Sequence, residues 1–215
     1  MKIISILAAA LLGAFIVPAA GQAMPPRKAV PEAVKLEAQK AVQALVNQVV
    51  RGNQDAAFKH MNPEWRAKLA RKNGGEKKLM ENMREQFRAL QAQGVVIRAM
   101  EAKKPAIAYE VDFGLVKKQV NGGIENAPVY KKWLVFVPTV SLISAANRKA
   151  QPPETYDIRV DGFQAAICTK GKNDWTFIDG ADLKAANLRE LFEFLPKDDK
   201  KLGFPKREKK MIKVR

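Results

Sequence analysis

Few side chains in this sequence could carry out acid–base, nucleophilic or metal chemistry. The chain contains one histidine, His60, and one cysteine, Cys168, and a zinc site usually draws three or four ligands from several such residues. His60 has no sequence neighbour that could orient it as a general base. Cys168 lies in the apolar segment 163–169, where a thiol is expected to be buried and inert. We therefore predict no catalytic residue, no metal site and no cofactor.

The carboxylates also favour structural roles. Asp179 and Asp182 flank Gly180 between a predicted strand and a predicted helix, where aspartate commonly forms turns and helix caps. Glu110 and Asp112 are two residues apart on a predicted strand, so they share the face opposite Tyr109. Because charged residues are seldom fully buried without a partner, we expect both carboxylates to face solvent.

Aromatic residues are the candidates for a ligand pocket. Tyr109, Trp133 and Trp175 lie on predicted strands, and ligand pockets are mainly apolar with a few polar groups such as a tyrosine hydroxyl. The alternative role for all three is packing in the core. Residues 105–196 have no net charge, so a pocket built there suits a small or apolar ligand better than a polyanion.

The formal net charge of +16 is unevenly distributed. Residues 24–104 have a net charge of +9 and residues 197–215 a net charge of +6. The last segment contains a basic cluster that could bind anions, formed by Lys206, Arg207, Lys209 and Lys210. Such attraction is nonspecific and fades beyond about 8–10 Å. No nucleic-acid-binding motif accompanies the charge, so a solvated surface is the alternative interpretation.

The first 23 residues have the pattern of a secretory signal peptide. Lys2 precedes an apolar run from Ile3 to Val17, and small residues follow up to Ala23. The run is shorter than the roughly 20 residues that a membrane-spanning helix needs. We expect cleavage after Ala23 and export to the periplasm or the extracellular space, with residues 24–31 as a linker.

Apolar periodicity predicts helices in the first half of the chain and strands in the second. Helical spacing extends over 32–51 and 76–93, with shorter helices after Asn53 and Asn62. Strands are expected at 95–100, 107–113, 129–142, 156–169 and 175–178, followed by a helix with its apolar residues between Leu183 and Leu195. Pro138 lies inside the longest of these strands and predicts a bulge or an edge. The order predicts a single α+β domain over 32–196, with helices on one face of a curved antiparallel sheet, and a basic, extended tail at 197–215.

Several of these features resemble the nuclear transport factor 2-like superfamily, and more narrowly its uncharacterised secreted bacterial members. The resemblance covers about residues 33–205 and rests on three segments: Gly74-Gly75 opening a helix that ends at Gln93-Gly94, Phe136-Val137-Pro138-Thr139 in a strand, and 175–180 followed by a leucine-rich helix ending at Leu195-Pro196. It implies a strongly bent sheet forming a cone-shaped barrel around a helix. It also implies a homodimer, because such sheets often pair face to face. The superfamily includes isomerases and dehydratases, but their site residues have no matching positions here.

Three functions stay open at this stage. The first is an exported, non-enzymatic domain that binds a small ligand or a component of the cell envelope. The second is nonspecific adhesion of the basic surface and tail to anionic polymers or to a membrane surface. The third is an isomerase or hydrolyase acting in the cone.

Overall fold

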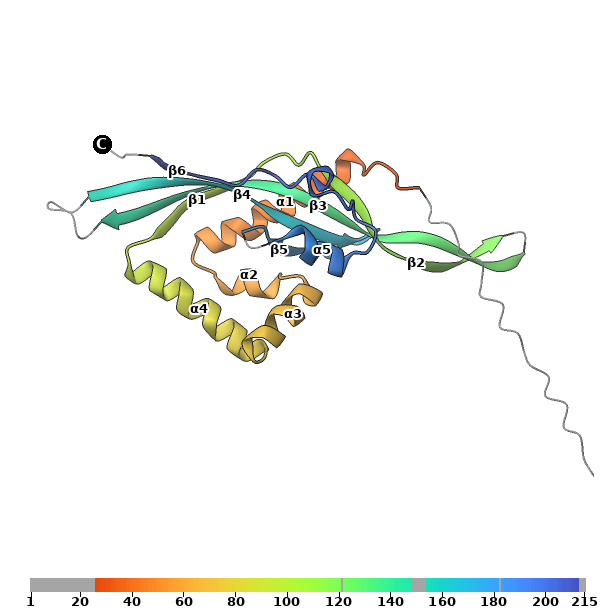
Figure 1. The fold of residues 1–215 in the computed structure, drawn as a ribbon, viewed down its shortest axis with the longest axis horizontal. Coiled ribbons are helices and arrows are strands. Elements are labelled where there is room, and N and C mark those ends of the chain that lie inside the picture. Colours follow the sequence, from red (N-terminus) through yellow and green to blue (C-terminus); the bar gives the residue numbers. More distant parts are fainter. Residues whose placement is uncertain (1–25, 121, 148–153, 182, 213–215) are drawn as a thin grey trace, which may run out of the picture.

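The two longest strands, β3 (Gly123–Asn147) and β4 (Glu154–Thr169), form the centre of a six-stranded antiparallel sheet. The computed structural model describes residues 26–120, 122–147, 154–181 and 183–212, so the predicted signal peptide lies outside the described residues. Figure 1 shows the sheet running along the length of the molecule. The α+β class predicted from the sequence is confirmed, and the sheet is not closed.

Each central strand changes partner along its length. Strand β3 pairs first with β2 (Ala108–Val120) and then with β1 (Val96–Ala102). Strand β4 pairs with β6 (Glu208–Ile212) near one end and with β5 (Thr176–Asp179) further along. The sheet is therefore β1-β3-β4-β6 in one half and β2-β3-β4-β5 in the other.

Pro138 lies where β3 changes partner. Its carbonyl accepts a hydrogen bond from the Lys103 amide, just after β1 ends. The amide of Phe136 donates to the Ile107 carbonyl, just before β2 begins. A proline has no N–H to donate. Because β2 begins only after β1 has ended, neither strand pairs with β3 at Pro138, and the proline fits inside a central strand. The sequence had predicted a bulge or an edge there.

Both faces of the sheet are covered by packed residues. The sequence pattern had predicted helices on only one face. Residues 134–137 of β3 and 165–168 of β4 are apolar at successive positions, so side chains of alternating direction enter two cores. Leu134 and Phe136 pack with α5 (Ala185–Leu191) and α6 (Asp199–Leu202). Val135 and Val137 pack with α1 (Glu32–Val50) on the opposite face.

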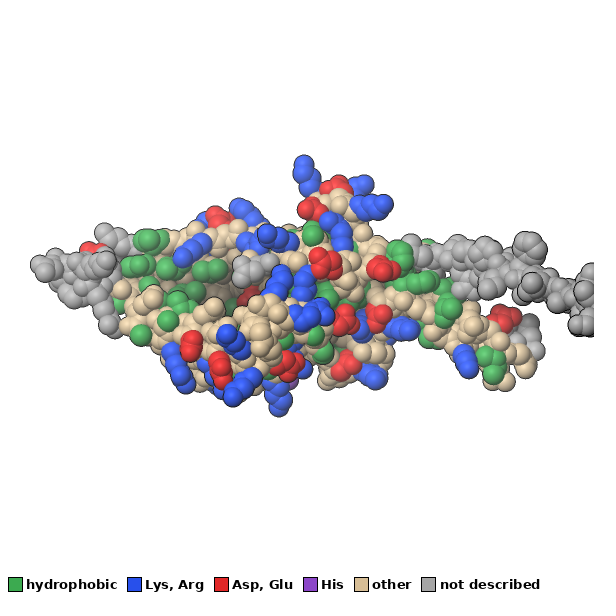
Figure 2. All heavy atoms as spheres, turned by 60° about the horizontal axis from the view of Figure 1, so that its bottom comes forward, with side chains coloured by type: hydrophobic (Ala, Val, Ile, Leu, Met, Phe, Trp, Pro, Cys, Tyr) green, Lys and Arg blue, Asp and Glu red, His purple; other side chains and the backbone are tan. Residues whose placement is uncertain are grey.

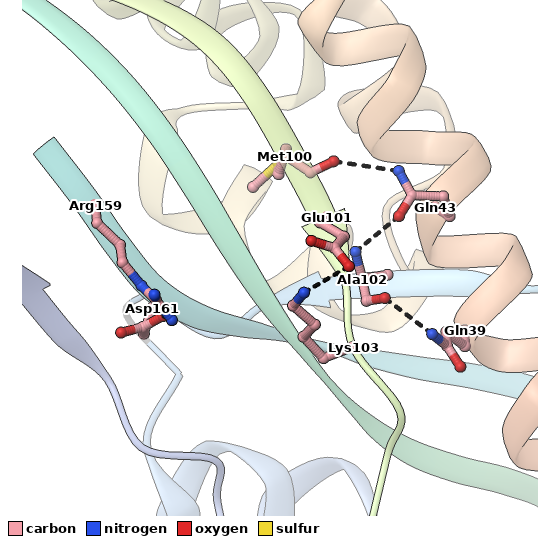
Figure 3. A network of polar contacts seen from close by, with 8 residues as sticks. All are labelled: Gln39, Gln43, Met100, Glu101, Ala102, Lys103, Arg159 and Asp161. Carbon is pink, nitrogen blue, oxygen red and sulfur yellow. Dashed lines mark hydrogen bonds and ion pairs between the residues drawn. The ribbon is translucent and has the colours of Figure 1, made fainter. Parts of the chain in front are cut away.

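Two glutamines join α1 to the outer edge of β1 (Figure 3). The Gln43 side chain accepts from the Ala102 amide at 2.8 Å and donates to the Met100 carbonyl at 3.2 Å. The Gln39 side chain donates to the Ala102 carbonyl at 2.9 Å. A sheet edge leaves backbone groups unpaired, and here the helix supplies their partners.

Three more helices follow α1 as the sequence predicted. They are α2 (Asp55–Lys59), α3 (Pro63–Asn73) and α4 (Glu76–Ala92). The Asn62 side chain caps α3 by accepting from the Trp65 amide at 3.1 Å. Gly74 ends α3 with φ at 79°, a left-handed conformation that glycine adopts without strain. Helix α4 packs against α3 and lies below the sheet in Figure 1.

The segment beyond residue 196 belongs to the packed structure. Leu202 is buried in the same core as Phe136, and Phe204 packs against that core. Strand β6 then adds to the sheet beside β4. The extended tail that the sequence predicted is thus a short helix and an edge strand, because Leu202 and Phe204 hold the chain against the sheet.

The hydrogen bonds from Gln43 to β1 give the first testable prediction. Gln43→Ala removes the partners of the Ala102 amide and the Met100 carbonyl, and the loss of the bond to the buried amide should lower the free energy of unfolding by about 1–3 kcal/mol. Lys40→Ala, an exposed change on the same helix, is the control and should change it by less than about 0.5 kcal/mol. Urea denaturation measures the free energy of unfolding of both variants. Equal decreases would show that the hydrogen bonds of Gln43 contribute no stability.

Candidate ligand-binding cavity

A cavity of about 330 Å³ lies between α1, α2, α4 and strands β1, β4 and β5. Its wall is mainly apolar, and four of the chain's seven methionines contribute to it. Methionine is flexible and polarisable, so it adapts to ligands of varied shape. The central apolar residues of the wall are Met61, Met80, Met83, Phe87, Met100 and Phe177.

Helix α4 supplies one wall because its apolar stripe does not enter either core. Met80, Met83, Phe87 and Leu90 recur at helical spacing and line the cavity. Within α4 only Leu79 is buried. Helical spacing in the sequence indicates an apolar stripe of Leu79, Met83, Phe87 and Leu90, but periodicity shows only which face of a helix is apolar and not what covers it.

An ion pair joins α2 to α4 at the cavity. Arg84 Nε donates to Asp55 Oδ1 at 2.9 Å, and Arg84 Nη2 donates to Asp55 Oδ2 at 2.6 Å. The hydrogen bonds from Arg84 hold the pKa of Asp55 below its usual value, so the carboxylate is ionised at neutral pH. This two-point contact fixes α4 relative to α2 and leaves Asp55 engaged rather than available as a base.

A second hollow of about 410 Å³ continues along the sheet from the first. Met100, Gln164 and Asp179 line both. The exposed wall of the second hollow is also mainly apolar, and its polar groups come from Thr139 and Ser141 of β3 and from charged residues of β6 and the segment that precedes it. Figure 2 shows hydrophobic side chains gathered on the sheet at the left, next to the helices.

The structure distributes the three predicted pocket aromatics over both faces of the sheet, away from the cavity. The Tyr109 hydroxyl donates to the Lys201 carbonyl at 2.9 Å, and burial raises the pKa of Tyr109. Trp133 lies under the Lys170 ammonium, 4.1 Å from the ring centroid. Trp175 is buried in the core beneath α1. None of the three lines either hollow.

Glu110 is buried, and the expectation that it faces solvent is wrong. Its side chain is 8% exposed, forms an ion pair with Lys170 and accepts from the Lys28 amide at 2.7 Å. Burial alone would raise the pKa of Glu110, but the hydrogen bonds from Lys170 and Lys28 outweigh it, and the pKa is lowered. The partners that compensate the buried charge are distant in the sequence. The alternation of side chains along the strand therefore could not reveal that Glu110 is buried. Lys28 lies in the predicted linker, which therefore contacts the domain.

Asp182 lies outside the described residues, and the other singled-out residues have structural contacts. Asp112 forms an ion pair with Lys132 at 3.0 Å. The backbone of His60 pairs with Phe177, because the Phe177 amide donates to the His60 carbonyl at 2.9 Å. Burial and the hydrogen bond to Asp174 raise the pKa of Cys168 to about 11, as expected for an unreactive thiol.

The basic cluster near the C-terminus is partly neutralised. Lys206 and Lys210 contact Glu208 at 3.1 and 3.2 Å. Arg207 donates to the Gly180 and Ala181 carbonyls at 2.9 and 2.7 Å, so it positions β6. Lys209 lines the second hollow. On the face shown in Figure 2, cationic and anionic side chains are interspersed over the helices.

Comparison of the chain with models of protein families, with curated proteins and with solved structures gives no match. Among the described residues, no group of His, Cys, Asp and Glu side chains is arranged to hold a metal ion. No helix in the same part of the chain is long and apolar enough to cross a membrane. The geometry of the cavity is therefore the main evidence on function.

The buried ion pair makes stability depend on pH. A carboxyl group whose pKa is lowered by folding stabilises the folded state above its unfolded value of about 4.5, and this contribution is lost as the pH falls through the folded pKa. Glu110→Gln should lower the free energy of unfolding by about 1–3 kcal/mol at pH 7. The difference from the unchanged protein should shrink as the pH falls below 4.5.

Denaturant unfolding at several pH values measures this difference. Glu85→Gln is a matched control, because Glu85 is exposed on α4 and the same charge is removed there. A pH-independent difference for Glu110→Gln would contradict the assigned ionisation of Glu110.

Proposed function

We propose that this chain is an exported, non-enzymatic domain that binds a small apolar molecule in the cavity between α1, α2, α4 and the sheet. The observation that carries the proposal is the apolar stripe of α4, which lines this cavity instead of packing into a core. The volume of about 330 Å³ lies at the lower end of the roughly 300–1,000 Å³ range of small-molecule sites. An apolar wall of this kind gains free energy when a ligand displaces water from it.

Two features of the sequence complete the proposal. The signal-peptide pattern of residues 1–23 supports export to the periplasm or the extracellular space. The segments that resemble the nuclear transport factor 2-like superfamily support a cone-shaped arrangement, in which the bent sheet and α1 enclose the binding site. In this arrangement the ligand enters between α4 and the sheet.

The two other functions have weaker support. Binding of anionic polymers by Lys206, Arg207, Lys209 and Lys210 is disfavoured because Glu208 and backbone carbonyls engage three of these cations. An isomerase or hydrolyase needs a poised acid or base beside the substrate. Neither His60 nor Cys168 lines the cavity. Of the two carboxylates in its wall, Asp55 is held by Arg84, and Asp179 accepts a hydrogen bond from the Ala181 amide at 2.9 Å, as in a turn.

A neutral apolar dye tests the cavity. N-phenyl-1-naphthylamine should bind the purified protein and increase in fluorescence. Met83→Glu places a charge on the cavity wall and should weaken dye binding about tenfold or more, because burying an unpaired carboxylate is costly. Ala89→Glu introduces the same residue at an exposed position of α4 and should leave dye binding unchanged. Equal binding by both variants would reject the cavity as the site, provided that thermal unfolding shows both to be folded.

Export has its own test. Full-length protein expressed in a bacterial host should appear outside the cytoplasm with Met24 as its first residue, as measured by intact-mass spectrometry. Leu11→Lys interrupts the apolar run and should leave the chain unprocessed. Lys28→Gln, beyond the expected cleavage site, should be processed normally. Retention of residues 1–23 in the exported, unchanged protein would contradict the cleavage, and cytoplasmic localisation would contradict export.

A further inference from the structure

The two hollows are adjacent and form one elongated site. They share Met100, Gln164 and Asp179, so a ligand in the first cavity can extend directly into the second hollow. The exposed wall is mainly apolar in both, so the ligand needs an apolar body. The second hollow adds the hydroxyls of Thr139 and Ser141, and a molecule that fills both hollows can place a hydroxyl-bearing group against them.

Three polar side chains of the sheet line the second hollow. Thr139, Ser141 and Gln164 are 4%, 6% and 9% exposed and line the hollow. No hydrogen bond joins these three side chains to other residues in the described part of the chain. Their polar atoms are not among the fully buried, unpaired side-chain atoms of the described residues, so they are open to the hollow. A hydroxyl-bearing ligand in the hollow can therefore exchange hydrogen bonds with them.

The sheet register places these groups together. Thr139 is opposite Gly162, and the neighbouring pair on the same face is Val137 with Gln164. Ser141 follows Thr139 on that face, two residues further along β3. Gly162 has no side chain, and a Cβ atom there would contact Thr139 Oγ1 at 3.5 Å. The glycine thus leaves open the space that the three polar groups surround.

The charges in the second hollow argue against an ionic head group. Arg207 and Lys209 line it together with Asp161, Asp179 and Glu208, so its cations do not outnumber its anions. Arg207 already donates to two backbone carbonyls, and Asp161 pairs with Arg159 at 3.0 Å. Hydroxyl and amide groups both donate and accept hydrogen bonds. They match an uncharged head group that carries hydroxyls.

We propose that the joined hollows bind one non-ionic, single-chain amphiphile, such as a monoacylglycerol. The acyl chain lies among Met80, Met83 and Phe87, and the head group hydrogen-bonds to Thr139, Ser141 and Gln164. This inference rests on the proposed function, since the chain end occupies the same cavity. The available volumes, about 330 and 410 Å³, are each within the roughly 300–1,000 Å³ range of small-molecule sites.

Three probes separate the two hollows of the site. The neutral dye reports on the first cavity, while 1-monomyristoylglycerol and myristate have the same chain length but different heads. Below their micelle concentrations, the monoglyceride should displace the dye with an affinity about tenfold higher than that of myristate, because only its head can both donate and accept in the second hollow.

Paired variants test the head-group contacts. The double variant Thr139→Val with Ser141→Ala keeps the shape of the hollow and removes both hydroxyls. It should weaken the monoglyceride about tenfold and leave dye binding unchanged. Ser144→Ala changes the same residue type on β3 but on the opposite face, and should alter neither affinity.

The outcomes distinguish this inference from the proposed function. Absence of dye binding would reject the cavity and with it both proposals. Dye binding with myristate equal to or tighter than the monoglyceride, or with no effect of the double variant, would overturn only the amphiphile proposal. Light scattering could also reveal a dimer whose formation excludes the dye. That result would assign the joined hollows to a second copy of the chain and would overturn the amphiphile proposal.

Discussion

The antiparallel pairing of β3 with β4 is the interaction on which the rest of the structure depends. Every other strand of the sheet pairs with one of these two. The same strands supply the centre of both cores, because their middle residues are apolar at consecutive positions. Beyond this doubly buried centre, Thr139, Ser141 and Gln164 replace apolar residues and the sheet forms the floor of the second hollow. One strand pair therefore provides both the stable body of the protein and the candidate site.

Local rules predicted much of the fold. Asn62 followed by Pro63 predicted the start of α3, and Gly74 predicted its end, because caps and left-handed turns depend on a few adjacent residues. The strands were located by their apolar runs, although β2 and β3 extend further than the pattern indicated. Residues such as Lys117 and Lys118 in this extension are polar, so hydropathy could not reveal that backbone pairing continues through them.

The sequence pattern could not predict the candidate site, because the site depends on contacts between residues that are far apart in the sequence. Tyr109 and Trp133 were reasonable candidates by residue type, but Tyr109 is opposite Leu134 and packs against the core on that face, whereas Trp133 is one position earlier on β3 and contacts Lys170. Met83 and Phe87 were recognised as apolar, yet only the three-dimensional arrangement shows that α4 packs on α3 and turns this stripe toward a cavity. Glu110 was misplaced because Lys170, its partner, is 60 residues away in the sequence.

Pro138 disfavours other registers of β3 in the sheet. It lies in the stretch of β3 between the residues paired with β2 and those paired with β1, where no donor is needed. Sliding β3 by two residues past these neighbours would move the proline opposite a paired backbone carbonyl and leave that acceptor without an N–H. The same slide would carry Ser141 away from Met100, its partner on β1 in the wall of the second hollow. A single imino acid thus penalises misaligned strand pairings and keeps the polar groups of the second hollow in one place.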